Sequence, residues 1–244
     1  MTPLVSCIIP VFNSERFIAA AVESILGQTH RPIETIVVDD GSTDGTGAML
    51  QQFSGVLKVI TQANAGHAAA RNAGIRAAAG EYIAFLDADD LWHRDKLARQ
   101  LQRLAENPAL GVTFSHLLNF SGNPPPAEID VSPATAGAVP GYTSVTMLAR
   151  RTLFHTIGLF DETLRHGNDR DWLLRAAEQG VHVDLLPEVL VYRRLHDANR
   201  SAALGGSSRA EYLRIIKASL DRRRAKDGHA TELDLGGARR QEEP

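Results

Sequence analysis

Apolar runs of strand length alternate with helix-like segments over the first 107 residues. The strand-like runs are VSCIIP (5–10), IETIVVDD (33–40), VLKVIT (56–61) and YIAFL (82–86). Between and after them lie RFIAAAVESIL (16–26), GAMLQQF (47–53), AAARNAGIRAAAG (68–80) and RDKLARQLQRLAEN (94–107), which predict helices. Regular alternation of this kind is typical of parallel sheets buried on both faces. We therefore predict an α/β protein with a Rossmann-like, mostly parallel central sheet and helices on both faces.

The pattern becomes irregular in the second half. Residues 120–141 are rich in Pro, Gly and Ser and predict a long loop, which either borders a substrate site or is a mobile insertion. TSVTMLAR (143–150) and VLVYRRLH (189–196) predict strands, and NDRDWLLRAAEQG (168–180) predicts a helix with an acidic start. We expect a basic amphipathic helix over 206–228 and a disordered tail over 229–244.

Two acidic clusters follow directly on predicted strands. Asp39 and Asp40 end one strand, and Asp87, Asp89 and Asp90 follow another within GEYIAFLDADDLW. In open α/β sheets ligands bind beyond the carboxyl ends of the strands, so both clusters should face one crevice. Carboxylates this close raise one another's pKa unless a positive charge lies between them. A bound cation is the simplest explanation.

The composition narrows the class of protein. The 244 residues are 43% hydrophobic and 23% charged, which allows a sizeable core and excludes disorder as the main state. A net charge of -3 provides no basic field, so we expect no nucleic-acid partner. The single cysteine, Cys7, excludes a disulfide or thiolate metal site within the chain. Because no basic leader or membrane-length apolar run is seen, we expect a cytoplasmic protein. Peripheral contact of the C-terminal basic helix with the inner face of the membrane stays open.

Eight motifs occur in an order that is typical of a known family. They are IIPVFNSERFI, SILGQTH, VVDDGSTDGT, NAGHAAARNAGI, GEYIAFLDADDLW, GLFDETL, NDRDWLLR and VYRRLHDANRS. From Leu4 to Ser201 the chain resembles the family 2 glycosyltransferases, which have the GT-A fold. The resemblance implies an inverting enzyme that moves a sugar from a nucleotide-diphosphate sugar, with a UDP-sugar favoured, to an acceptor hydroxyl. It also implies a role in cell-surface polysaccharide, exopolysaccharide or lipopolysaccharide biosynthesis.

The same resemblance divides the chain and names its partners. Residues 1–205 would form the GT-A domain, with 1–116 as the nucleotide-binding half and 117–205 as the acceptor-binding half. The partners would be a nucleotide-sugar donor and a saccharide or lipid-linked saccharide acceptor. A non-catalytic sugar-nucleotide-binding protein of the same fold is one alternative. A sugar-phosphate nucleotidyltransferase is another, although PVFNSERF lacks the glycines of its phosphate loop.

The resemblance implies, motif by motif, which residues would bind the nucleotide. The matching positions are Pro10, Phe12, Glu15, Asp40, Arg71 and Asp87. Asp40 would accept a hydrogen bond from a uracil imide, Arg71 would approach the diphosphate, and Asp87 would reach the ribose. Asp39 would hold the turn DGSTDGT. The alternative interpretation of Glu15 is a charge at a helix N-terminus. The alternative interpretation of Arg71 is a surface ion pair.

Metal and acceptor residues are implied in the same way. Asp89 and His196 match the positions that approach Mn2+ or Mg2+, and Asp90 either shares that task or caps a helix starting near Trp92. Asp169 matches the general base that takes the proton of the acceptor hydroxyl. Asn168 stands where the family pattern has Glu, which puts the acceptor-side hydrogen bonding in doubt. Trp172 is assigned either to sugar stacking or to the core.

Overall fold

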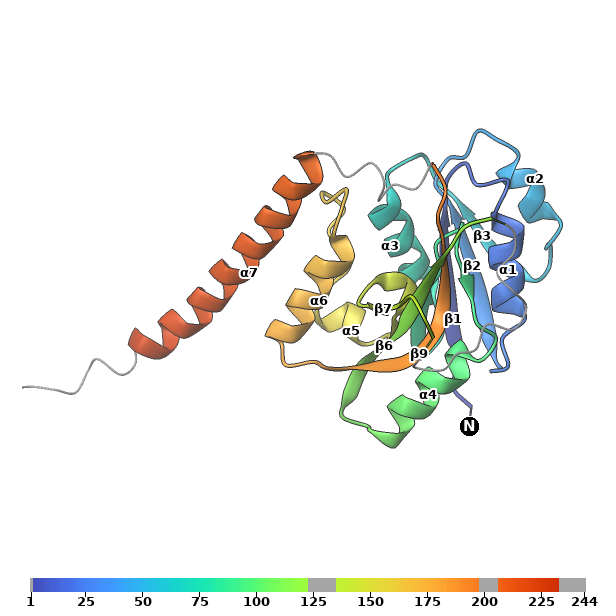
Figure 1. Ribbon diagram of the computed structural model, residues 1–244. Coiled ribbons are helices and arrows are strands. Elements are labelled where there is room, and N and C mark those ends of the chain that lie inside the picture. Colours follow the sequence, from blue (N-terminus) through green and yellow to red (C-terminus); the bar gives the residue numbers. More distant parts are fainter. Residues whose placement is uncertain (1, 123–134, 198–205, 233–244) are drawn as a thin grey trace, which may run out of the picture.

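The computed structural model describes residues 2–122, 135–197 and 206–232, and its centre is one curled sheet (Figure 1). The strands are β1 Val5–Val11, β2 Ile33–Asp39, β3 Leu57–Thr61, β4 Tyr82–Phe85, β5 Leu91–Trp92, β6 Leu110–Phe120, β7 Ala138–Gly141, β8 Leu148–Arg150 and β9 His182–Arg194. Within the described residues their order is β3-β2-β1-β4-β8-β6-β9-β5, and β7 pairs with β6.

Helices cover both faces of this sheet, as the sequence predicts. They are α1 Ile18–Leu26, α2 Thr46–Gln51, α3 His67–Ala77, α4 Lys96–Glu106, α5 Leu153–Thr156, α6 Asn168–Glu178 and α7 Gly206–Glu232, with a 3-10 turn η1 at Ser144–Thr146. Alternate residues of β1 enter different cores because strand side chains alternate in direction. Cys7 and Ile9 pack with α1, α2 and α4, whereas Ile8 packs with α3, α5 and α6. β1, β2 and β4 are therefore buried on both sides, whereas the edge strand β3 is largely exposed.

The first half of the sheet is parallel throughout. β1 pairs in parallel with β2 and β4, and β2 pairs in parallel with β3. All four predicted strands are present here, within two residues of their expected bounds. The helix expected from residue 16 begins at Ile18, and the hydroxyl of Ser14 donates to Phe12 O instead of capping it. The parallel ladders bring the carboxyl ends of β1, β2 and β4 to one edge.

The second half is mixed. β6 and β9 form a long parallel ladder, whereas the antiparallel ladders β4–β8, β6–β8, β6–β7 and β5–β9 are short. The long loop expected over 120–141 is shorter than predicted at its C-terminal end, because β7 occupies 138–141. Residues 123–134 lie outside the described part. The proposed division at 116/117 falls inside β6, so the two halves share a strand.

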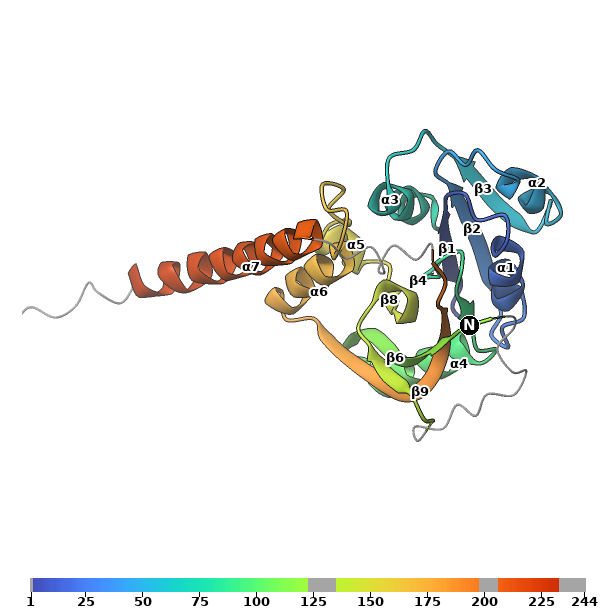
Figure 2. The same cartoon turned by 45° about the horizontal axis from the view of Figure 1, so that its top comes forward.

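Helix α7 lies along α6 and extends away from the sheet (Figures 1 and 2). It starts at Gly206 as expected but runs to Glu232, four residues into the segment predicted to be disordered. Residues 233–244 lie outside the described part. Among the described helices, none combines the length and apolar character that crossing a membrane requires. The location of the protein in the cell stays a prediction.

Candidate functional site

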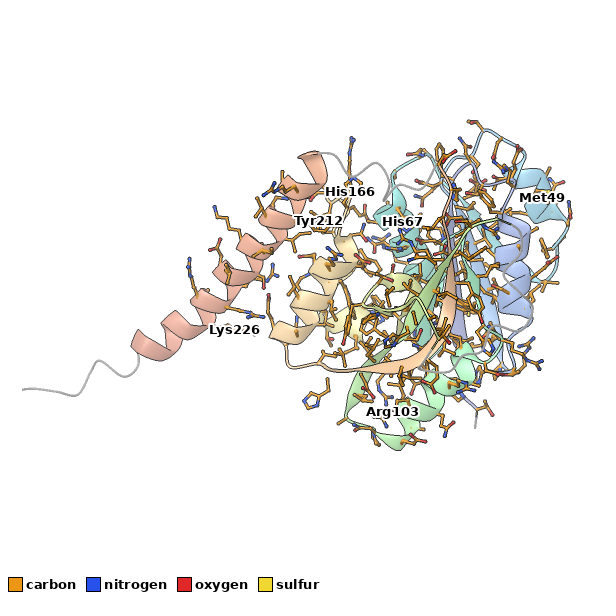
Figure 3. All side chains as sticks on the ribbon, viewed as in Figure 1. Met49, His67, Arg103, His166, Tyr212 and Lys226 are labelled. Carbon is orange, nitrogen blue, oxygen red and sulfur yellow. The ribbon has the colours of Figure 1, made fainter. Side chains whose placement is uncertain are left out.

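The side chains of His67, Arg71 and Asp87 meet just beyond the end of β4. Arg71 Nη2 lies 3.1 Å from Asp87 Oδ1, and His67 Nε2 lies 3.2 Å from the same oxygen. His67 and Arg71 are four residues apart on α3 and therefore project from one face of that helix. Figure 3 shows His67 at the N-terminal end of α3, beside the carboxyl edge of the sheet. The first turns of α3 thus position an imidazole and a guanidinium over the acidic loop.

Arg71 is buried and joins this loop to the start of α6. Only 4% of it is exposed, and its Nη1 donates to Asn168 Oδ1 at 3.0 Å. The guanidinium also lies over the rings of Phe85 and Phe160, 5.8 and 5.6 Å from their centroids. A buried guanidinium requires such compensation because its desolvation is costly. The alternative of a surface ion pair for Arg71 is wrong, because the side chain is inside the protein.

Asp89 and His196 form the pair expected at a metal site. His196 Nε2 lies 2.9 Å from Asp89 Oδ2, and both side chains are partly exposed. Within the described residues, no three His, Cys, Asp or Glu side chains are grouped so as to hold a metal by themselves. Mg2+ and similar ions on nucleotides commonly use one or two protein ligands together with phosphate oxygens. A carboxylate and an imidazole also suit Mn2+, so this donor set fits an ion that a diphosphate would complete.

Asp90 points away from that pair. It is 3% exposed, and its Oδ1 accepts a hydrogen bond from Arg194 N at 3.0 Å. Burial, reinforced by the carboxylates of Asp87 and Asp89, raises the pKa of Asp90 well above its usual range. The alternative role of Asp90 as a helix cap is wrong, because β5 follows it and α4 begins only at Lys96. Asp90 instead ties the acidic loop to the end of β9.

The aspartates after β2 organise two neighbouring loops. Asp40 Oδ1 accepts hydrogen bonds from Gln62 Nε2 at 2.7 Å and Ala65 N at 2.9 Å, and its Oδ2 accepts one from Gly66 N at 2.8 Å. Asp39 Oδ1 accepts from Ser42 N at 2.9 Å, within the turn that it was expected to hold. Asp40 therefore fixes the loop that leads into α3 and Arg71.

The segment after β1 contributes one exposed aromatic ring. Phe12 is 47% exposed, whereas Pro10 is buried within β1 opposite Val38. Glu15 Oε2 accepts a hydrogen bond from Gly45 N at 2.7 Å, which joins the turns after β1 and β2. Glu15 lies before the first turn of α1, and its carboxylate instead meets the N-terminus of α2, since Gly45 directly precedes that helix. Of these three residues, Phe12 has the free surface that a base requires.

Asp169 lies in the first turn of α6, beside a small pocket. Its Oδ2 accepts a hydrogen bond from Ser144 N at 3.3 Å. The pocket is lined by Phe114, Tyr142, Thr143, Ser144, Met147, Asp169 and Leu173. Tyr142 is 46% exposed and its ring lies 5.5 Å from that of Phe114. A carboxylate, a hydroxyl and an accessible aromatic ring thus surround one opening.

Trp172 belongs to the core, so a sugar-stacking role for it is wrong. Its side chain is fully buried, and its Nε1 donates to Gly158 O at 2.9 Å. The indole stacks on Phe154 with the ring centroids 4.8 Å apart. Both ring faces are thus enclosed by the protein, and core packing is the correct alternative.

Comparisons with known proteins show the family to which the chain belongs. Residues 6–157, more than half of the chain, match the family model described as Glycosyl transferase family 2. The chain belongs to this family. An uncharacterized glycosyltransferase of Rickettsia typhi is 33% identical over 213 residues, which cover 81% of this chain and 65% of that protein. The putative teichuronic acid biosynthesis glycosyltransferase TuaG of Bacillus subtilis is 42% identical over 127 residues, 50% of each chain. The chain therefore spans less than two thirds of the length of these relatives.

Solved structures show the fold of this family 2 member. S. aureus TarS 1-349 in complex with UDP-GlcNAc has a TM-score of 0.69 at 21% identity, covering 86% of this chain and 65% of that one. The mannosyltransferase PcManGT from Pyrobaculum calidifontis, in complex with GDP-Man and Mn2+, has a TM-score of 0.64 at 22% identity, covering 83% and 60%. At such identities the likeness shows the fold, and the predicted GT-A fold is confirmed.

Three residues at the family 2 site had no role assigned from sequence. His67 precedes Arg71 by one helical turn, and this spacing was the available signal. Arg194 donates from Nε to Asp89 O at 3.1 Å, and it lies within the motif VYRRLH. Tyr142 follows the Pro-rich segment and has no distinguishing pattern, so only the structure places it beside Asp169.

Proposed function

We propose that this family 2 member is a metal-dependent, inverting glycosyltransferase that uses a nucleotide-diphosphate sugar, preferably a UDP-sugar. The observation that carries the proposal is the double contact of Arg71, with Asp87 on one side and Asn168 on the other. This contact places a buried cation between the acidic loop and the residue that precedes Asp169. The expected diphosphate-binding group and the expected base are thereby coupled through one side chain.

Asp89 and His196 are the residues that would hold Mn2+ or Mg2+. When bound, such an ion offsets the negative charge that develops on the departing diphosphate. Arg71 supplies a fixed positive charge nearby, and its buried contacts keep the guanidinium oriented before the donor arrives. The partly exposed Asp89 and His196 and the buried Arg71 thus act on the same leaving group.

Asp169 is proposed as the general base. The acceptor oxygen forms a bond to the anomeric carbon while the bond from that carbon to the diphosphate oxygen breaks, and its electron pair leaves with the diphosphate. The acceptor proton passes to the Asp169 carboxylate, which the N–H of Ser144 helps to orient. Attack opposite the leaving group inverts the anomeric centre. The acceptor would enter through the opening beside Tyr142 and Thr143.

The proposed preference for uridine rests on Phe12 and Asp40, which directly follow the carboxyl ends of β1 and β2. A carboxylate offers about four acceptor sites, and three hydrogen bonds to Asp40 come from the loop before α3. A remaining site can accept from a uracil imide while the exposed ring of Phe12 lies against the base. The complex of TarS with UDP-GlcNAc supports the same preference. The similarity to TuaG, a putative teichuronic acid biosynthesis glycosyltransferase, supports a cell-surface polysaccharide or a lipid-linked precursor as the acceptor.

A thermal-shift panel tests this function. UDP, GDP, dTDP, ADP and CDP and their sugars are each added with Mn2+, with Mg2+ or with EDTA. A ligand at a hundred times its Kd stabilises the protein by about 2.7 kcal/mol, which is readily measured. We expect UDP and a UDP-sugar to stabilise the protein only with metal, and turnover to release UDP. Release of pyrophosphate, or equal shifts with EDTA, would overturn the proposal.

A further inference from the structure

Helix α7 is attached to the domain by one face only. Glu178 of α6 accepts hydrogen bonds from Ser219 and Arg222, and Lys226 Nζ donates to Glu178 O. Burial of Glu178 opposes its ionisation, but the hydrogen bonds from Arg222 and Ser219 outweigh this and lower its pKa. Ile215 and Ser219 are buried on the same face. Figure 3 shows Tyr212 and Lys226 toward opposite ends of this contact.

The N-terminal part of α7 also holds the loop before α6. The carboxylate of Glu211 accepts hydrogen bonds from the backbone N–H of Arg165 and His166. Gly167 follows with φ 72, and an added Cβ there would lie 2.8 Å from Tyr212 Cε1. Only glycine fits this left-handed position beneath the Tyr212 ring. The inward face of α7 is therefore specifically fitted to α6.

The outward face of α7 carries a second apolar stripe. Leu213, Ile216 and Leu220 are 62%, 53% and 46% exposed. Their spacing of three and four residues puts them on one exposed side of the helix, roughly a third of a turn around its axis from Ile215 and Ser219. A helix that needed only to pack on α6 would be polar on this side. Figures 1 and 2 both show α7 extending away from the sheet, with α6 beside it.

Positive charge borders this stripe. Residues 206–232 contain seven Lys or Arg and four Asp or Glu, a net charge of +3 in a chain whose net charge is -3. The exposed basic residues three or four positions from the stripe are Arg209, Lys217, Arg223 and Arg224. Arg222 and Lys226, in contrast, are turned toward Glu178. The stripe and its basic border together form a surface with an apolar centre and cationic edges.

We propose that this outward face of α7, centred on Leu213, Ile216 and Leu220, docks on an anionic lipid bilayer. The apolar stripe would enter the interface between headgroups and acyl chains, and the basic border would bind the lipid phosphates. A second copy of the chain is a poorer occupant, because two such faces would bring arginines against arginines. Attraction of one basic residue to an anionic surface is worth roughly a fivefold change in partitioning. The proposal is independent of which donor the site takes.

Vesicle sedimentation tests this docking with the full chain. Phosphatidylcholine vesicles with and without phosphatidylglycerol are compared at low and high salt. We expect at least a tenfold stronger partition to the vesicles that contain phosphatidylglycerol, reduced by salt. The triple variant Leu213→Ser, Ile216→Ser, Leu220→Ser and the double variant Arg223→Glu, Arg224→Glu should each lower that partition by roughly tenfold or more.

The matched control is Val56→Ser with Val59→Ser, which removes two exposed apolar side chains near β3, far along the sheet from α7. This control should sediment like the native protein. All variants should keep the circular dichroism spectrum and the thermal midpoint of the native protein. Equal binding to both vesicle types, or binding that both α7 variants retain, would overturn the proposal. So would a native dimer in light scattering that the triple variant converts to a monomer, since a second copy would then cover the stripe.

Discussion

Contacts between side chains on the donor side of the site join elements that are far apart in sequence. This side is formed by Asp40, Arg71, Asp87, Asp89 and His196. Arg71 and Asn168 are separated by 97 positions, and Asp89 and His196 by 107. On the proposed acceptor side, formed by the pocket around Asp169, the carboxylate of Asp169 accepts hydrogen bonds from the backbone N–H groups of Ser144 and Arg170. The other groups that line this pocket are aromatic rings, aliphatic chains and hydroxyls.

This difference separates the charged contacts that binding a diphosphate would require from the shape and apolar contacts that binding an acceptor would require. Removing the carboxylate of Asp87 leaves the buried guanidinium of Arg71 without its charged partner, which costs several kcal/mol. A substitution of Tyr142 or Leu173 changes shape and apolar contact while leaving the charged contacts in place. If the two sides bind donor and acceptor as proposed, the donor side suits a constant diphosphate, and the acceptor side can change shape without loss of the charged contacts. Each prediction below perturbs one side and measures whether the other responds.

The largest effect is expected from Asp169→Asn. The amide keeps the shape of the side chain but cannot take the acceptor proton, so transfer should fall by roughly a hundred- to ten-thousand-fold. Donor-dependent thermal stabilisation should stay within error of the native value, because Asp169 lies on the acceptor side. Near-native transfer by this variant would place the base elsewhere. Loss of donor binding would show that the two sides are not separate.

Asp89→Ala should remove metal-dependent donor binding. Without this carboxylate His196 remains as the single proposed side-chain ligand, so the stabilisation of about 2.7 kcal/mol by saturating donor should be lost. His196→Ala should weaken the same response, more with Mn2+ than with Mg2+, because imidazole is a poorer ligand for Mg2+. Calorimetric titration of donor with each ion and with EDTA measures both. Unchanged affinity with metal in Asp89→Ala would remove Asp89 from the metal site.

Asn168→Asp tests the side chain that joins the two sides. Arg71 already contacts the carboxylate of Asp87, and a second carboxylate at 168 would neutralise more of its charge. We expect roughly a tenfold weaker affinity for the donor, about 1.4 kcal/mol. Asn168→Ala serves as the control, since it removes the hydrogen bond without adding charge. Equal donor affinity in the native protein and in Asn168→Asp would mean that Arg71 does not meet the diphosphate.

The sequence predicted the donor half of the fold better than the acceptor half. β1, β2 and β4 are continuous apolar runs because both of their faces are buried, and such runs are visible without other information. β9 instead extends from His182 to Arg194 through Pro187, which interrupts the apolar pattern and is typical of a turn. The ladder with β6 shifts register near Leu186 and Val189, so Pro187 lies where no regular hydrogen bond is needed.

The same limit applies to the site. The ends of β2 and β4 could be located from sequence, and with them the acidic clusters at one edge of the sheet. The direction of each carboxylate could not, because it depends on tertiary contacts, which for Asp89 and Asp90 come from partners 107 and 104 positions away. Asp90 illustrates this, since the hydrogen bond from Arg194 N turns it away from Asp89 across 104 positions. Tyr142 and the wall of the acceptor pocket likewise depend on how β6, β7 and η1 pack.

The smallest expected effect concerns the buried residues Lys96 and Gln100, which lie beneath the wall of the pocket around Asp169. Gln100 Nε2 donates to Thr146 O at 2.8 Å, and the buried Lys96 donates from Nζ to Gln100 Oε1 at 2.8 Å, beneath Met147 of the pocket. Burial lowers the pKa of Lys96 from 10.5 to about 7. Between those two pH values the unfolded chain binds a proton that the folded protein does not, so this lysine makes stability rise with pH.

Lys96→Met removes that dependence. From pH 7 to pH 8 the free energy of unfolding of the native protein should rise by about 1 kcal/mol relative to the variant, as measured by urea titration at both values. The range stops at pH 8 because burial raises the pKa of Cys7 to about 12, and its unfolded thiol loses protons at higher pH with the opposite sign. Parallel pH profiles for the two proteins would show that Lys96 keeps an ordinary pKa. If the donor-dependent thermal shift of the variant remains native, the support of the acceptor wall is independent of the donor side.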